Sequence, residues 1–277
     1  MSFASATSVD SNGTHYRGSI AEGWDVVGNA NGGYLMAIAA RAMSLTADRP
    51  HPVTVTGHFL APGRVGPVTV APEVLKQGRS FATVRADLRT EDRTLVSLLG
   101  SFGDLSNLEG PVRIDAEPPA LPHPDECVRV EPSPAGFPPA MMDKIDLRLH
   151  PDDAGFGLGK PSGRPEFRGW FRPLPGEELD VFTLLLAVDA FPPTIFNADL
   201  PVAWTPTVEL TAHVRGIPQP GWLRCRFSTR FITGGMLEED GEVWDESGRL
   251  VAQSRQLALM PRTQNAERRT QNAAAAE

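Results

Sequence analysis

The sequence is short of cysteine, of positive charge and of long apolar runs, and each shortage excludes a class of protein. Its 277 residues include 2 cysteines, Cys127 and Cys225, too few for a disulfide scaffold or a cysteine-rich zinc site. Lys and Arg number 26 against 34 Asp and Glu, which gives a net charge of −8. Non-specific nucleic-acid binding needs a basic surface instead, so we expect no nucleic-acid partner.

No apolar run reaches the roughly 20 residues of a membrane-spanning helix, and the polar N-terminus lacks the apolar core of a secretory signal. We therefore expect a cytoplasmic protein without a membrane span. The sequence also lacks a Gly-x-Ser-x-Gly elbow, a P-loop and a Rossmann fingerprint, which argues against the enzyme classes built on them. His58 and His213 lie in predicted strands without a recognised metal-ligand spacing, so we interpret them as structural and expect no metal.

The stretch from 181 to 191, VFTLLLAVDAF, is predicted to be a buried helix that carries one carboxylate, Asp189. Acidic residues precede it, where they suit a helix N-terminus, and Pro192-Pro193 ends it. A carboxylate in apolar surroundings is costly unless it has partners or a function. The alternative is a solvated carboxylate at the helix end.

The first half of the chain reads as a strand, a helix and four more strands. Asn31 is a good N-cap for an apolar helix over 34–43, and alternating residues predict strands at 15–20, 53–59, 66–75, 81–89 and 94–102. The second half repeats this order, with strands at 166–171, 208–214, 222–231, 237–244 and 249–260. We expect antiparallel sheets, each with a helix packed on one face.

One shift of 155 positions relates the two halves. It places His58 on His213, Leu95-Val96 on Leu250-Val251, and Tyr34 on Asp189. A shared offset supports internal duplication. The proline-rich stretch from Leu105 to about Pro139 is predicted to be an irregular linker. The predicted organisation is an N-terminal unit at 1–106, a linker at 107–145, a C-terminal unit at 146–262 and a mobile tail at 263–277.

Segments in both halves then resemble a known family. Asn31-Gly32-Gly33-Tyr34, HFLAPG at 58–63 and LKQGRSF at 75–81 resemble the N-terminal half of acyl-CoA thioesterase II-like enzymes. Asp189 with its predicted helix, Pro206-Thr207-Val208 and VAQSRQ at 251–256 resemble that family's catalytic segments. The resemblance implies an α+β double hot-dog fold, in which two tandem units each wrap an antiparallel sheet around a long central helix.

The resemblance also implies a catalytic trio that holds one water, which falls here on Asp189, Thr207 and Gln256. Thr205, two residues earlier, is the alternative threonine. The family carries Asp-His after the threonine, where this chain has Glu209-Leu210. It also carries Gln where this chain has Tyr34. Those differences leave the trio possible, but the family's substrate length and the shape of its acyl pocket do not carry over to this chain.

We assign Gly32, Gly33 and Tyr34 to substrate binding, and the backbone amides of the glycine pair to the carbonyl oxygen of the substrate. Tyr34 in place of a second Asp predicts one site per chain. The resemblance implies a thioester hydrolase of lipid metabolism that takes acyl-CoA, needs no cofactor and forms a homo-oligomer. Two alternatives remain: a non-catalytic acyl-ligand binding protein, and a hot-dog hydratase or dehydratase, which would need a histidine beside Asp189.

Overall fold

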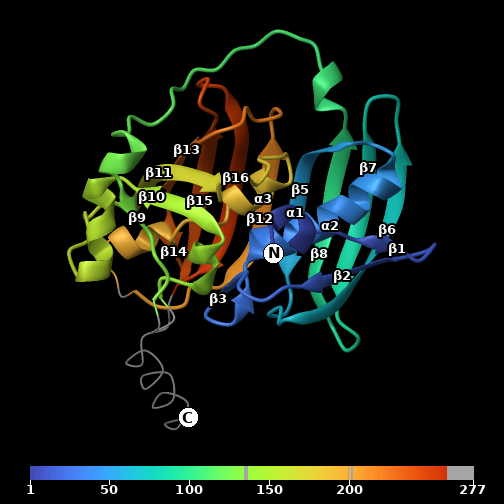
Figure 1. Ribbon diagram of the computed structural model, residues 1–277, viewed down its shortest axis with the longest axis horizontal. Helices are drawn as coiled ribbons and strands as arrows, with labels where there is room; N and C mark the ends of the chain where they lie inside the picture. Colours follow the sequence, from blue (N-terminus) through green and yellow to red (C-terminus); the bar gives the residue numbers. More distant parts are fainter. Residues whose placement is uncertain (134–136, 199, 201, 261–277) are drawn as a thin grey trace.

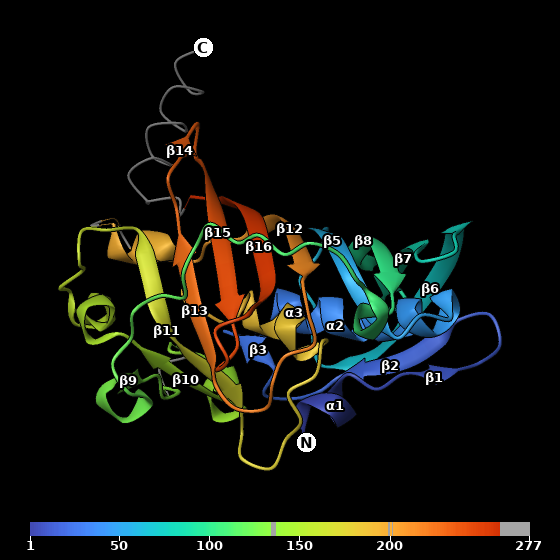
Figure 2. The ribbon, with the colours of Figure 1, turned by 90° about the horizontal axis from the view of Figure 1, so that it is seen from above.

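The computed structural model describes residues 1–133, 137–198, 200 and 202–260, and one antiparallel sheet runs through them (Figure 1). Figure 2 shows the sheet curving around the helices α2 and α3. The predicted tail at 263–277 lies outside the described residues. No helix in the described part of the chain is both long enough and apolar enough to cross a membrane.

The elements alternate between a few helices and many strands. The helices are α1 (Phe3–Ala6), α2 (Gly32–Ala47) and α3 (Thr183–Ala187), with 3-10 turns η1 (Leu105–Asn107), η2 (Pro124–Glu126), η3 (Ala140–Asp143), η4 (Pro151–Leu158) and η5 (Thr194–Asn197). The first-half strands are β1 (Asp10–Ser11), β2 (Tyr16–Ile20), β3 (Asp25–Val26), β4 (Asn29–Ala30), β5 (His51–Phe59), β6 (Gly66–Gln77), β7 (Ala82–Arg89) and β8 (Thr94–Gly103). The others are β9 (Val128–Arg129), β10 (Ile145–Leu149), β11 (Glu166–Pro173), β12 (Thr207–Val214), β13 (Leu223–Ser228), β14 (Ile232–Thr233), β15 (Met236–Trp244) and β16 (Leu250–Leu259).

The order of the strands is mirrored about the middle of the sheet. It runs β1-β2-β6-β7-β8-β5 and then β12-β16-β15-β13-β11-β10-β9, with β14 paired to β15. The two halves join where β5 pairs with β12, and Thr56 lies directly opposite Thr211 there. Their Oγ1 atoms are 2.8 Å apart, and the two residues are separated by 155 positions. The central strand pair therefore supports the predicted offset.

The first predicted helix is confirmed. The side chain of Asn31 caps α2 by accepting the backbone N–H of Tyr34 at 2.9 Å, and α2 packs on β5, β6, β7 and β8. At its C-terminus Asp48 adopts a left-handed conformation with φ 51°. Of the 16 residues of α2, 12 are buried, as expected for a helix largely covered by a sheet.

The second long helix is absent, so the prediction of a helix over 181–191 is wrong in length. Only Thr183–Ala187 is helical, and Asp189 lies in the turn that follows. Pro192 and Pro193 exclude a helix beyond Phe191 but do not explain its end at Ala187, and the chain resumes as η5. No second helix as long as α2 is therefore present among the described residues, and the prediction of a long central helix in each half holds for the first half alone.

Two further segments are more ordered than the sequence predicts. Residues 1–13, predicted to be a loose arm, contain α1 and β1, and Phe3 is 2% exposed with its ring edge-on to Trp24 at 5.5 Å. The predicted linker contains η2, β9 and η3, and β9 pairs with β10 inside the main sheet. Its prolines exclude long strands but suit the start of 3-10 turns, as Pro124 does in η2. The bounds of the two units stay predictions.

Candidate active site

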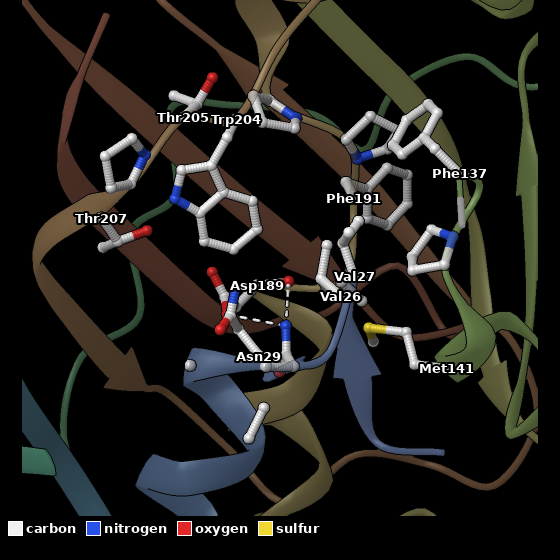
Figure 3. Close-up of a pocket in the computed structure, with 18 of the residues that line it drawn as sticks. Val26, Val27, Asn29, Phe137, Met141, Asp189, Phe191, Trp204, Thr205 and Thr207 are labelled. Atoms are coloured by element: carbon white, nitrogen blue, oxygen red, sulfur yellow. Dashed lines mark hydrogen bonds between the residues drawn. The ribbon is translucent and has the colours of Figure 1, made fainter. Parts of the chain in front are cut away.

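An apolar cavity of about 720 Å³ lies beside the start of α2. Its described walls come from parts of 26–32, from 35, 59–63, 130 and 137–142, from 156, 188–196 and 202–207, and from single residues of β15 and β16. In Figure 3, Asp189 lies near the centre of the labelled side chains, with Thr205 and Thr207 on one side and Phe137 and Met141 on the other. The volume is that of a small-molecule site.

Asp189 is held by the first turn of α2. Its Oδ2 accepts the backbone N–H of Gly33 at 2.9 Å and the side-chain N–H of Asn31 at 2.8 Å. The same Asn31 nitrogen also donates to the carbonyl oxygen of Asp189 at 2.8 Å. Burial raises the pKa of Asp189 to about 6, although the hydrogen bonds from Gly33, Gly32 and Asn31 oppose that rise. The carboxylate is therefore ionised at neutral pH but is still basic enough to accept a proton.

The two glycines let the helix end approach Asp189 closely. A Cβ atom on Gly33 would lie 2.2 Å from the carbonyl oxygen of Leu185 and 3.0 Å from the Cβ of Asp189. A Cβ on Gly32 would lie 2.8 Å from the ring of Phe59 and 3.0 Å from Oδ2 of Asp189. Both glycines are thus required by the contact between α2 and the Asp189 turn, and Gly32 also lines the cavity.

Thr207 and Gln256 line the same cavity as Asp189. Thr207 begins β12 beside an irregularity in its pairing with β16, and such bulges redirect side chains. Gln256 lies on the inner face of β16 and is 8% exposed. Neither side chain makes a hydrogen bond within the described residues, whereas Thr205, which also lines the cavity, donates to the carbonyl of Ala203 at 3.1 Å. The Thr207 hydroxyl therefore has no partner among the described residues, whereas the Thr205 hydroxyl already uses its proton for Ala203.

Tyr34 lies outside the cavity lining. Its ring is fully buried and stacks on Trp24, with ring centroids 5.4 Å apart. Its hydroxyl donates to the carbonyl of Ala6 at 3.0 Å and accepts the backbone N–H of Ala21 at 3.0 Å. The structure thus gives Tyr34 a packing role, and its predicted contact with substrate has no geometric support.

Glu239 is a second carboxyl group in the cavity, and sequence reasoning missed it. It lies on β15, is 7% exposed, and accepts the backbone N–H of Thr194 at 2.8 Å. Burial raises its pKa to about 7, and the charge on Asp189 contributes to that rise. The alternation of the strand was the available signal, because Leu237, Glu239 and Val243 occupy one face and the other two are core residues.

The two halves differ at the equivalent ladder positions. In the second half Leu210, Gln256 and Glu239 lie side by side across β12, β16 and β15. In the first half the corresponding positions across β5, β8 and β7 are Val55, Gly100 and Val84. A Cβ on Gly100 would contact Met43 of α2 at 3.4 Å, so α2 covers the first-half position. These polar cavity groups therefore belong to the second half alone, and α2 contributes the hydrogen bonds to Asp189.

His58 and His213 are exposed on the central strands and do not line the cavity. His58 lies opposite Glu209 across the junction of β5 and β12. The geometry gives neither histidine a part in the site.

An apolar arm of the cavity extends away from Asp189 (Figure 3). Its aromatic rings pack edge to face, with Phe137 at 6.3 Å from Phe156 and 5.9 Å from Phe196. Met141 and Phe191 complete this wall, and both are buried. The segment with Phe137 and Met141 falls in the stretch that the sequence predicts to be a linker, so that stretch forms part of the cavity wall.

Comparison with known proteins identifies the family. Residues 20–103 match the acyl-CoA thioesterase N-terminal domain, and residues 124–260 match the acyl-CoA thioesterase C-terminal domain. A structure from Thermobifida fusca, described as a candidate thioesterase II, is 35% identical with a TM-score of 0.85 and covers 94% of this chain and 97% of its own. A hot-dog protein from Alicyclobacillus acidocaldarius shares the fold at 22% identity, with a TM-score of 0.83 and coverage of 94% and 98%.

A Mycobacterium tuberculosis protein, described as uncharacterised, is 28% identical over 270 residues, which cover 89% of this chain and 91% of the relative. The matches span both halves of the chain and agree with the antiparallel sheet and the resemblance of its motifs. The chain belongs to the acyl-CoA thioesterase family.

Proposed function

We propose that this protein hydrolyses an acyl-CoA to a free acid and CoA through direct attack of one water molecule held by Asp189, Thr207 and Gln256. The observation that carries the proposal is the ionisable Asp189 in an apolar cavity where the side chains of Thr207 and Gln256 make no hydrogen bond to any described residue. We also propose that the mirrored halves are two hot-dog units that share this one site.

In the proposed reaction the Asp189 carboxylate takes a proton from the water while the water oxygen attacks the thioester carbon. The carbonyl π electrons move to the oxygen and return when the carbon–sulfur bond breaks. The CoA thiolate then takes the proton from Asp189, which restores the carboxylate. Thr207 and Gln256 orient the water, and such positioning lowers the entropic part of the barrier.

The backbone amide of Gly33 has a different role from the one that the sequence suggests. It donates to Asp189 and so orients the base. The carbonyl oxygen of the substrate needs another donor.

The described lining of the cavity contains no histidine. Hydratase or dehydratase chemistry would need one beside Asp189, so the cavity favours hydrolysis.

The first experiment is free-thiol release from a panel of acyl-CoAs with short, long and aromatic acyl groups, run in ¹⁸O-labelled water. We expect thiol release with one ¹⁸O atom in the product acid, because the proposal has water attack the carbonyl carbon. Acyl-CoAs that bind without thiol release would contradict the proposal and identify a non-catalytic acyl-ligand binding protein.

Substitution of the two threonines separates the site hydroxyl from its neighbour. Thr207→Val is expected to lower kcat about 10-fold or more, because the water loses one hydrogen-bond partner. Thr205→Val serves as the matched control and should stay within about 2-fold of the wild type, since the Thr205 hydroxyl already donates to Ala203. The kcat of each variant checks this, and a larger loss in Thr205→Val would reverse the assignment.

The apolar arm is proposed to hold the acyl chain. Met141→Trp adds volume to a buried wall residue and should shorten the arm, because a packed wall has little room to yield. We expect kcat/KM for long acyl-CoAs to fall about 10-fold or more relative to short ones. The acyl-chain profile of wild type and variant checks this, and an unchanged profile would place the acyl chain elsewhere.

A further inference from the structure

Glu239 has the position of a reacting group. Its side chain lines the cavity from the inner face of β15, and Thr194 of η5 donates its backbone N–H to Oε2. No Lys, Arg or His forms an ion pair with Glu239 within the described residues. A buried carboxyl without a cation is unfavourable in its ionised form. The cavity thus holds a carboxyl group that the water-holding trio does not use.

The site also needs a donor that the trio does not supply. Negative charge develops on the carbonyl oxygen as water attacks, and a preorganised donor at that oxygen is usually a large part of catalysis. The nearest backbone and amide donors, Gly33 N–H and the Asn31 amide, both point to Asp189. Gln256 and Thr207 are assigned to the water, which leaves the carbonyl oxygen without a partner from this set.

The ladder places Glu239 next to the water-holding group. Glu239 and Gln256 are directly opposite each other on β15 and β16, and both side chains are on the inner face. Neighbouring strands lie roughly 5 Å apart, so one group placed between these side chains can contact both. A thioester carbonyl group beside Gln256 is therefore within reach of Glu239 as well.

We propose that Glu239, in its protonated form, donates a hydrogen bond to the thioester carbonyl oxygen and is a catalytic residue of the hydrolysis proposed above, on which this inference rests. The carboxyl group of Glu239 keeps its proton throughout the reaction. It donates the hydrogen bond while the carbonyl oxygen of the substrate is negative, and no covalent bond of Glu239 is made or broken. Its other oxygen accepts the N–H of Thr194, which fixes the direction of the hydroxyl.

The surroundings of Glu239 favour the protonated form. Burial raises its pKa to about 7, and the charges of Asp189, from the turn after α3, and Glu238, from its own strand, raise it too. The hydrogen bonds from Thr194 have the opposite effect, and Gln256 on β16 carries no charge. The pKa of Asp189 is about 6, so the order of the two values favours a proton on Glu239 beside an ionised Asp189.

Two substitutions at 239 test the proposal. Glu239→Gln keeps a donor at every pH, so kcat should stay within about 10-fold of the wild type. Glu239→Val copies Val84, the residue at the equivalent first-half position, and removes the donor, so kcat should fall about 10²–10³-fold. Equal kcat in Glu239→Val and wild type would overturn the proposal.

The pH profile gives a second, independent readout. Wild-type kcat should fall about tenfold per pH unit above a pKa near 7 as Glu239 loses its proton, and the fall should be absent in Glu239→Gln. An identical alkaline limb in both proteins would overturn the proposal. This comparison decides the question even if Glu239→Val does not fold.

A third measurement does not depend on turnover. In a ketone analogue of acyl-CoA, with a methylene in place of sulfur and a ¹³C-labelled carbonyl, the infrared carbonyl band should lie lower when bound to wild type than when bound to Glu239→Val. A shifted band without thiol release from any acyl-CoA would contradict the proposed hydrolysis but would still support a hydrogen bond from Glu239 to the carbonyl oxygen. Thiol release with no band shift would contradict the proposed role of Glu239 and would leave the proposed hydrolysis intact.

Discussion

Asp189→Asn is expected to lower kcat for thiol release about 10²–10⁴-fold while it makes the folded protein more stable at pH 8. The loss follows because an amide cannot take the proton from water, and general-base catalysis contributes about that factor. Asn31 and Gly33 both donate to Oδ2, so an amide oxygen in that place keeps both hydrogen bonds. The geometry of the turn should therefore survive the substitution.

The gain in stability follows from the pKa. The value for Asp189 rises from 3.8 to about 6 on folding, so the folded state binds the proton more tightly than the unfolded state. Stability due to this group is fully present below about pH 4 and is lost as the pH rises through about 6. At about 1.36 kcal/mol per pKa unit, the loss is roughly 3 kcal/mol at pH 8, and an uncharged Asn avoids it.

Urea unfolding at pH 8 and pH 4 checks the prediction. The free energy of unfolding of Asp189→Asn should exceed that of the wild type at pH 8 and match it near pH 4. Asp92→Asn changes an exposed carboxylate and serves as the control, with no expected change at either pH. If Asp189→Asn is less stable than the wild type at pH 8, the ionised Asp189 does not destabilise the fold. If the variant keeps full activity, Asp189 is not the general base.

Gly33→Ala is expected to destabilise the fold by at least about 3 kcal/mol and to abolish most of the activity. The added Cβ would lie 2.2 Å from the carbonyl oxygen of Leu185 and 3.0 Å from the Cβ of Asp189. Neither atom is at the end of a flexible side chain, so neither can move away easily. The start of α2 must move away from α3, and overpacking of this kind is costly. The same movement breaks the hydrogen bond from Gly33 to Asp189, so the base loses its orientation.

Gly157→Ala is the matched control, because a Cβ there has no heavy atom within 4 Å. Its urea midpoint and rate of thiol release should match the wild type. Wild-type stability in Gly33→Ala would mean that the close approach of the two helices is not required. Measurements at a temperature where both variants remain folded separate the loss of activity from global unfolding.

Much of the sheet could be predicted because one of its faces is buried. Alternation at 222–231 placed Leu223, Cys225 and Phe227 on one face, and all three are buried in β13. The Asn cap before an apolar run likewise predicted α2. Local patterns of this kind are decided by neighbours a few positions away, so sequence reasoning finds them.

The pocket was less predictable because distant segments build it. Phe137 and Met141 reach it from a proline-rich stretch whose local pattern resembles a linker, and Glu239 is one acid in the run Glu238-Glu239-Asp240. The alternation with Leu237 and Val243 indicates which of those carboxylates faces inward, but the sequence does not show that this position borders a cavity.

The predicted trio does line one cavity, although its catalytic role remains a proposal. Tyr34 does not line it, because successive helix residues point about 100° apart.

The ends of the sheet limit how copies of this chain can assemble. On the described path the outermost strands, β1 and β9, have only 2 residues each. Short edge strands offer few unpaired backbone groups, which discourages the addition of another strand at either end of this path. However, β2 pairs only with Gly66–Val70 of β6, so within the described residues the stretch of β6 from 71 to 77 has an open edge on that side. If copies of this chain assemble by strand addition, we expect the contact at this stretch of β6.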